Sequence, residues 1–425
     1  MSIRVKRFIQ LLCLCVGATV IYFIPVHLRA TFYVPMQEVF SLTNTQIGDL
    51  AGLYGTMTIF TYLPGGWLAD KFSPRKMLAL SYFGTGILTF FLLLKPGYSM
   101  MMVIFALCGV TTTLTFWAAL LKITRDFGKN DGQGKAFGGL EGGRGLAATV
   151  ILMGATLIYG MMGGNPTSMM IIISIFGILN ILTGIFTLIV FDEIKEEKKT
   201  GENPFAGIVE CAKNPNVWLI SFIVLGIYTV HSVSQYIAPF ANEVFAATVV
   251  FGSILSLSKQ WMKPVGGFIG GFFADKIGIT NMLSIGVVLL VISTGVFALV
   301  PGNPSLLILL IINTLIMFTI VAGLRGLYFA NMNEAGIPLR LTGTVIGFAS
   351  TIGFTADVFI PVISGRLLDA YPGGLGYRMM FGIGALFCVI SFVLLQVFKK
   401  RNAKTIDVIK LEKLGHQKVE ENAAE

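Results

Sequence analysis

Charged residues are scarce in this 425-residue sequence. They make up only 12% of it, whereas hydrophobic residues make up 55%, and 49 glycines come in addition. A soluble globular domain has about 25% charged residues, so the composition excludes a water-soluble enzyme and indicates a chain embedded in a lipid bilayer. At about 20 apolar residues for each spanning helix, the length accommodates roughly a dozen transmembrane helices.

Cysteine is also rare, and the spacing of the cysteines does not indicate a chemical function. The cysteines lie in or beside apolar runs without the paired spacing of a metal, redox or disulfide site. They are Cys13, Cys15, Cys108, Cys211 and Cys388. Gly134-Lys135 lacks the spacing of a phosphate-binding loop, so no ATPase motor is present. We therefore expect packing roles for the cysteines, no metal, no cofactor and no enzyme activity.

Apolar stretches long enough to span a bilayer recur twelve times. They lie at 8–28 (or on to 40), 47–69, 77–94, 99–121, 136–161, 167–190, 216–240, 244–273, 282–300, 304–330, 341–365 and 377–398. The sequence thus predicts an all-α membrane protein with twelve transmembrane helices. A polar, solvated linker at 191–215 separates a six-helix bundle at 1–190 from a second at 216–398, and a tail follows at 399–425.

Lysine and arginine are distributed asymmetrically between the predicted loops. With the amino terminus placed in the cytoplasm, 23 of the 31 basic residues lie on the inner side and three, Lys95, Arg366 and Arg378, on the outer side. This positive-inside pattern predicts a multi-pass protein of the inner (cytoplasmic) membrane with both termini in the cytoplasm. Because the net charge of +9 is dispersed in this way, we expect no nucleic-acid partner.

The two predicted halves share a repeated sequence. Residues 65–78 recur 205 positions later at 270–283, with seven of fourteen identical. In nearly the same frame, Val26-His27 followed by Pro35 matches Val230-His231 followed by Pro239. Duplicated halves are the architecture of secondary transporters, whose substrate site lies near the midplane between them.

The first copy of the repeat contains Gly66-x-Leu-Ala-Asp-Lys71, followed by Arg75 and Lys76. This run resembles the loop signature of the major facilitator superfamily, although Ser73-Pro74 replaces the glycine usual before the basic pair. The resemblance implies two pseudo-symmetric six-helix bundles and transport by alternating access. It also implies a cytoplasmic gate made by Gly66, Asp70, Lys71, Arg75, Lys76 and Asp275.

Five basic residues fall inside the predicted spans, where a charge costs about 2.5–3.5 kcal/mol on insertion scales. They are Arg29, Arg144, Lys259, Lys263 and Arg325. They outnumber the carboxylates of Glu141 and Asp357, so we expect the substrate, a small anion, to be the missing counterion.

Each of these charges also has a structural interpretation. Arg29 could anchor the outer interface, and Lys259 could extend its ammonium to that interface. Glu141 and Arg144 are three residues apart and could pair on one helix. Arg325 and Asp357 could form the matching pair in the second half.

His27 and His231 occupy repeat-related positions, each eight residues before a proline. A histidine on an apolar helix is commonly a packing residue, but the symmetry favours a function. Imidazole titrates near neutral pH, so either residue could bind the anion or carry a coupling proton. Glu141 and Asp357 are the alternative proton carriers.

A second resemblance, to particular branches of the superfamily, covers the end of helix 1 and the start of helix 2. The spacing of Arg29 from Leu42-Thr43-Asn44-Thr45-Gln46-Ile47-Gly48 is similar to that in the organophosphate:phosphate antiporter and anion:cation symporter branches. The resemblance implies an anion clasp of Arg29, His231 and Arg144, with Trp117 as the aromatic residue of helix 4. The family has arginine on helix 7 and histidine on helix 5, so this sequence exchanges the two residue types.

The sequence as a whole predicts a secondary active transporter for a small organic anion, of the sugar phosphate or sugar acid class. It would be coupled to protons or to a counter-anion, and it would act as a monomer. Two alternatives are a multidrug or lipid exporter and a non-transporting anion receptor. Helix 5 lacks the Gly-Pro-x-x-Gly-Pro signature of drug:proton antiporters, which disfavours the first of these.

Overall fold

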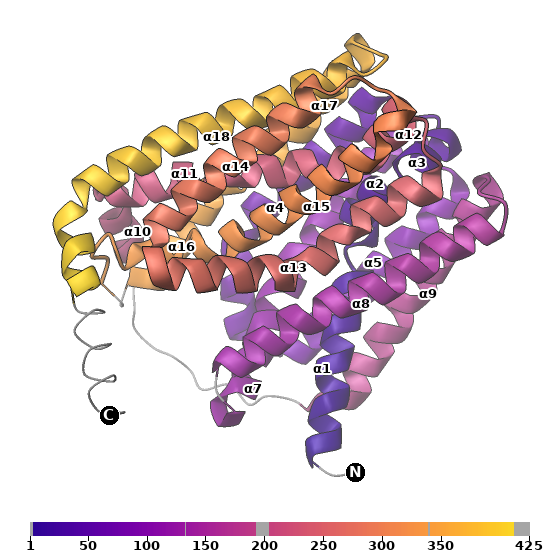
Figure 1. Cartoon of the computed structure of the whole chain (residues 1–425). Coiled ribbons are helices and arrows are strands. Elements are labelled where there is room, and N and C mark those ends of the chain that lie inside the picture. Colours follow the sequence, from indigo (N-terminus) through magenta and orange to yellow (C-terminus); the bar gives the residue numbers. More distant parts are fainter. Residues whose placement is uncertain (1–2, 132, 193–203, 339–340, 412–425) are drawn as a thin grey trace, which may run out of the picture.

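The structure is a computed structural model that describes residues 3–131, 133–192, 204–338 and 341–411. Within these residues the chain forms helices and no strands. Figure 1 shows them as one elongated bundle of long, roughly aligned helices.

The first half contains nine helices and three short segments of different pitch. The helices are α1 (Ile3–Val20), α2 (Leu28–Thr31), α3 (Tyr33–Phe40), α4 (Asn44–Lys71), α5 (Pro74–Phe91), α6 (Tyr98–Gly109), α7 (Ala118–Asp131), α8 (Gln133–Met161) and α9 (Pro166–Val190). Phe23–His27 and Val110–Trp117 form π-helical turns, and Leu92–Leu94 forms a 3-10 turn.

The second half follows a similar plan. Its helices are α10 (Pro204–Lys213), α11 (Pro215–Val233), α12 (Ile237–Phe245), α13 (Val249–Ile277), α14 (Ile279–Leu299), α15 (Leu307–Leu327), α16 (Thr342–Gly353), α17 (Ala356–Ala370) and α18 (Leu375–Arg401). The 3-10 turns are Ser234–Tyr236, Pro304–Leu306 and Ala330–Met332.

The number of membrane crossings agrees with the predicted twelve. Nine helices among the described residues are long and apolar enough to span a bilayer, and the bent pair Val5–Val20 and Phe23–Thr31 makes a tenth. α4 and α13, of 28 and 29 residues, run through the same bundle and complete the set. Helices form most of their backbone hydrogen bonds internally, which a chain surrounded by lipid requires.

The repeated glycines make equivalent contacts in the two halves. A Cβ on Gly65 of α4 would lie 2.9 Å from the carbonyl oxygen of Leu114, and a Cβ on Gly270 of α13 would lie 3.0 Å from the Cα of Gly323. Both glycines therefore bring the second helix of a half against its fourth. This close approach is the common use of small residues between membrane helices.

The structure adds detail to two parts of the predicted course of the chain. The first span is not one helix, because it bends by 44° between Val20 and Phe23 and passes through a π-helical turn. The segment at 191–215, predicted as a polar linker, contains the helix α10 (Pro204–Lys213). Its half-apolar sequence, Pro-Phe-Ala-Gly-Ile-Val-Glu-Cys-Ala-Lys, carries an amphipathic pattern that charge counting alone overlooks.

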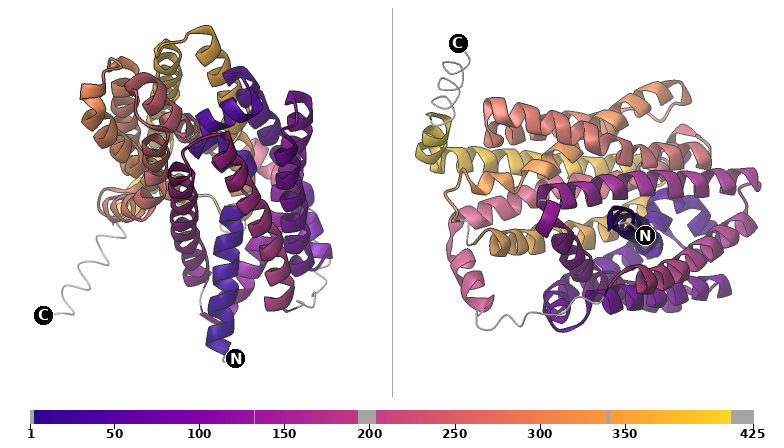
Figure 2. Two further views of the ribbon diagram at one scale, coloured as in Figure 1. Left: turned by 90° about the vertical axis from the view of Figure 1, so that its right-hand side faces the viewer. Right: turned by 90° about the horizontal axis from the view of Figure 1, so that it is seen from below.

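The two halves lie side by side, with α8 against α13 and α4 against α17 (Figures 1 and 2). We define the far end as the end of the bundle that holds the start of α4 and the end of α17. There Asp369 accepts hydrogen bonds from the backbone N–H groups of Asn44 (3.0 Å) and Thr45 (2.7 Å), and so caps α4 from the other half. Arg366 adds an ion pair to Asp49 at 2.8 Å. The far end is thus held by charge-assisted bonds between the halves.

Gly48 controls how closely these helices approach, because a Cβ there would lie 2.3 Å from the carbonyl oxygen of Pro361. We expect Gly48→Ala to lower the thermal unfolding midpoint of the purified protein by forcing α4 away from α17. Gly382→Ala on α18 is the matched control, since no atom outside its own helix backbone lies within 4 Å. It should leave the midpoint unchanged or raise it, because alanine is the better helix former. Equal changes in both variants would contradict this account of the far end.

Candidate functional site

Three spans are interrupted within the bundle, two of them at predicted site residues. His27 ends the π-helical turn Phe23–His27, and Trp117 ends the π-helical turn Val110–Trp117. Gln235 is the middle residue of the 3-10 turn Ser234–Tyr236, which separates α11 from α12. Changes of helical pitch in the middle of a span free backbone groups and often mark functional positions.

The break after α11 holds Lys259 in the protein interior. The Lys259 ammonium donates to the carbonyl oxygen of His231 at 3.2 Å and to the hydroxyl of Ser234 at 2.8 Å. Its nitrogen also lies 5.8 Å from the centre of the Phe318 ring. These contacts turn Lys259 inward, so it does not extend to the membrane interface.

Arg325 on α15 lies over α11. One guanidinium nitrogen, Nη1, is 3.1 Å from both ring nitrogens of His231, and the guanidinium carbon is 5.3 Å from the centre of the Tyr228 ring. Tyr228 donates its hydroxyl hydrogen bond to Asp357 on α17 at 2.9 Å. Arg325 and Asp357 therefore share Tyr228 instead of forming the direct pair that their positions suggested.

Arg29 on α2 is buried between the halves, with only 4% of its surface exposed. Its Nη2 donates to the side-chain oxygen of Gln235 at 2.5 Å, and its guanidinium carbon lies 5.4 Å from the centre of the Tyr236 ring. Nε and Nη1 are buried without a hydrogen-bond partner. Arg29 is thus an interior residue and not an anchor at the outer interface.

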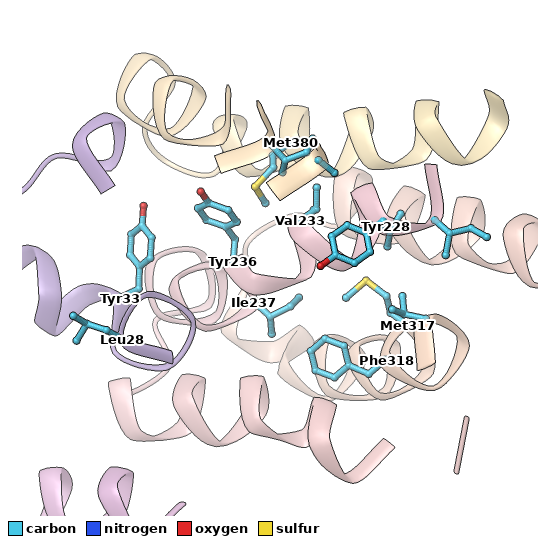
Figure 3. Close-up of a cluster of buried hydrophobic side chains, with 14 of the residues drawn as sticks. Leu28, Tyr33, Tyr228, Val233, Tyr236, Ile237, Met317, Phe318 and Met380 are labelled. Carbon is cyan, nitrogen blue, oxygen red and sulfur yellow. The ribbon is translucent and has the colours of Figure 1, made fainter. Parts of the chain in front are cut away.

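Aromatic side chains from both halves line the position of Arg29. Tyr33 of the first half and Tyr236 of the second lie side by side, with ring centres 5.7 Å apart (Figure 3). Leu28 and Ile237 pack beside them, and Phe318 faces the same region from α15 (Figure 3). The arginine is therefore held where protein excludes lipid.

In the first half, Arg144 of α8 lies over the indole of Trp117, with its guanidinium carbon 5.5 Å from the ring centre. His27 is near enough to Arg144 and Lys263 to interact with their charges. The side chain of Glu141, one turn before Arg144, lies outside the described residues, so its predicted pairing is a prediction still.

These residues form one group, which we call the cation cluster. It contains Arg29, Arg144, Lys259, Lys263 and Arg325, together with His27 and His231. Lys259 is within electrostatic range of Arg29, Lys263 and Arg325, and His27 extends the cluster to Arg144. Among the described side chains, Asp357 is the carboxylate that interacts with these cations.

Sequence reasoning missed the residues that hold the cluster in place. Tyr228, Ser234, Gln235 and Tyr236 all come from the α11 region and bind or cover the cations. The signal for Ser234, Gln235 and Tyr236 was the run of polar residues after His231, which interrupts an otherwise apolar helix. Polar groups buried in a membrane span need partners, and here several of those partners are the cluster's cations.

The predicted cytoplasmic gate lies at the opposite end of α4 and α13 from the far end. The side chains of Gly66, Asp70 and Lys71 lie outside the described residues. Arg75 donates to the carbonyl oxygen of Leu188 within its own half. Lys76 follows in the first turn of α5, and Asp275 lies exposed in the last turn of α13.

Across the described ranges, no three side chains of His, Cys, Asp or Glu lie together in an arrangement that could hold a metal ion. The cluster instead presents cationic and hydroxyl donors. Such groups can bind an anion.

Comparison with known sequences decides the family. A profile described as the Major Facilitator Superfamily matches residues 8–361. The chain belongs to the major facilitator superfamily. This family membership, together with the fold, makes it a transporter-type membrane protein.

Relatives and solved structures agree with this assignment. The Escherichia coli (strain K12) inner membrane protein YihN is 30% identical over 411 residues, which cover 93% of this chain and 97% of YihN. A bacterial homologue of the human lysosomal transporter Spinster, solved in an inward-facing, unoccupied conformation, superposes with a TM-score of 0.77 at 16% identity and covers 96% of this chain and 99% of its own. The nucleoside transporter NupG gives 0.71 at 16%, covering 94% and 100%. At this identity the two structures establish the shared fold alone.

The contribution of the Tyr228–Asp357 hydrogen bond to stability can be tested by mutation. Asp357 Oδ1 is buried without a partner, so the tyrosine hydroxyl is the donor that the structure gives this carboxylate. We expect Tyr228→Phe to reduce the free energy of unfolding by about 2 kcal/mol, the usual cost of removing a hydrogen bond from a buried charged group. Thermal unfolding in detergent measures it. Tyr371→Phe, at an exposed tyrosine, is the control, and equal stability of the two variants would contradict the role of this bond.

Proposed function

We propose that this protein is a secondary active transporter for a small organic anion of the sugar phosphate or sugar acid class. The observation that carries the proposal is the cation cluster, in which Lys259 lies within electrostatic range of Arg29, Lys263 and Arg325 in the membrane-spanning bundle, and His27 within range of Lys263 and Arg144. Like charges at such depth are unfavourable unless a counterion is present. An anionic substrate would supply the counterion during transport.

The residue types favour a carboxylate or phosphate head group. Arginine presents a planar fork of N–H donors that fits two oxygens of such a group, whereas lysine acts as a point charge. Arg29 has two buried nitrogens without a partner, so it retains donors for a ligand. The rings and hydroxyls of Trp117, Tyr228 and Tyr236 beside the cluster suit the polar body of a sugar.

The anion would be coupled to a proton or exchanged for a second anion. Asp357 and Glu141 on the one hand, and His27 and His231 on the other, are the groups that could carry the proton. Exchange needs no proton carrier, because a second anion would neutralise the cluster on the return step. The two modes differ in whether a proton gradient drives uptake.

The proposed setting is the inner membrane, with both termini in the cytoplasm. YihN is itself named as an inner membrane protein, and the distribution of lysine and arginine follows the positive-inside rule. In this orientation the far end is the outer end, and the gate residues of the α4–α5 loop face the cytoplasm.

Purified protein in proteoliposomes should take up a labelled anion from a panel of glucose 6-phosphate, glycerol 3-phosphate, gluconate and glucuronate. We expect Arg29→Ala and Arg144→Ala to weaken binding of that anion about 100-fold each, as is typical for a lost charged hydrogen-bond donor. Lys400→Ala removes one positive charge at the exposed end of α18 and should change binding less than twofold.

Three outcomes would contradict the proposal. Transport of lipophilic cations or lipids in place of the anions would identify an exporter. Anion binding without flux would identify a receptor. Full activity of both arginine variants would place the site elsewhere.

A pH jump separates the two coupling modes. If protons are coupled through Asp357, an inward proton gradient should accelerate uptake in the wild type but not in Asp357→Asn, while counterflow in anion-loaded vesicles should survive in both. Uptake that needs a loaded counter-anion and ignores the gradient would instead establish exchange. Glu141→Gln provides the matched comparison in the first half.

A further inference from the structure

Arg29 serves both as the proposed ligand of the anion and as part of the closure of the far end. The short α2 segment, Leu28–Thr31, follows the bend in helix 1 and lies against the second half. Its carbonyl oxygens accept hydrogen bonds from α13, namely Ala30 from Ser256 at 2.9 Å and Thr31 from Ser253 at 2.5 Å. The bond from Arg29 to Gln235 is a third link between the halves, one residue away.

Gln235 is an incomplete partner for a buried arginine. Its amide oxygen is neutral and accepts from Nη2, while Nε and Nη1 are buried without a hydrogen-bond partner. A carboxylate or phosphate would carry opposite charge and could accept two of these N–H groups at once, which makes a considerably stronger interaction. An anion that reaches Arg29 can therefore compete successfully for the guanidinium.

We propose that Gln235 holds Arg29 in the empty protein and is displaced by the anion, so that substrate binding removes one of the links that close the far end. This inference rests on the proposed function, because it takes Arg29 as an anion ligand. It assigns Gln235 a positioning role: the residue occupies the substrate's place on Arg29 until the substrate arrives.

The local backbone permits such a release. Helix 1 is not continuous on either side of α2: the π-helical turn Phe23–His27 precedes it, and Phe32, with φ −116° and ψ 43°, follows it outside helical geometry. A segment between two breaks can shift as a unit without breaking the hydrogen bonds of a long helix. Gln235 also lies in a 3-10 turn between α11 and α12. Both partners of the bond therefore lie at breaks.

Two substitutions at position 235 should act in opposite directions. Gln235→Leu keeps the approximate volume but removes the acceptor, so the anion no longer has to displace it, and its Kd should fall about tenfold. Gln235→Glu supplies a permanent carboxylate on Arg29 and should raise the Kd at least about tenfold. Binding of glucose 6-phosphate and gluconate is measured by calorimetry on the purified full chain. Changes in Kd of opposite sign cannot arise from partial unfolding, because partial unfolding would weaken binding in both variants.

A second measurement follows the far end in the empty protein. Spin labels at Ser99→Cys and Ser305→Cys, two exposed positions at the far ends of the two halves, report the separation of those ends once the native cysteines are replaced by alanine. Gln235→Leu should increase the population with a longer label distance, and Gln235→Glu should decrease it. Gln396→Leu on the exposed face of α18 is the control and should leave the distances unchanged.

The outcomes distinguish this inference from the proposed function. Wild-type protein that binds no member of the anion panel overturns both. Wild-type protein that binds an anion, together with a Kd that Gln235→Leu leaves unchanged or raises, overturns the inference alone. Label distances that stay the same in empty Gln235→Leu also overturn it alone, because they show that the bond does not contribute to closure.

Discussion

The structure depends on one constraint, the cost of holding positive charges inside a bilayer. Charged side chains are costly against lipid, and four of the five cations have contacts inside the protein: Arg29 with Gln235, Arg144 with Trp117, Lys259 with Ser234, and Arg325 with His231. The printed partners of Arg29 and Lys259, the side-chain oxygen of Gln235 and the hydroxyl of Ser234, are neutral and do not cancel a full charge. This excess of positive charge is the basis of the proposed anionic substrate.

The same constraint accounts for the irregular helices. A regular helix uses all of its carbonyl oxygens internally, whereas the breaks beside His27, Trp117 and Gln235 release some of them. The carbonyl of His231 becomes a ligand for Lys259 in this way. Irregular backbone is tolerated at this depth because the surrounding helices bury it away from lipid. The groups that bind the charges therefore lie at the same positions where the helices can bend.

Much of the fold was predictable because its signals are local or additive. Hydropathy over about 20 residues gives the crossings, and the repeat of residues 65–78 gives the two halves. The inward position of Lys259 and Arg29 could be expected only as one of two options, since a long side chain near a helix end can reach water. The direct Arg325–Asp357 pair was a reasonable expectation from two lone opposite charges. It failed because Tyr228, from a third helix, lies between them.

By itself the sequence determined how many helices cross the membrane, which segments correspond between the halves, and that positive charge would exceed negative charge inside the spans. Only the tertiary structure decided the partners: Gln235 with Arg29, Ser234 with Lys259, and Asp369 with the start of α4. Each of these pairs joins residues from different helices, and two of them join the two halves. Hydropathy and helical periodicity describe one helix at a time. The distance between side chains on separate helices depends on how those helices bend, break and cross, and that is fixed only when the bundle packs.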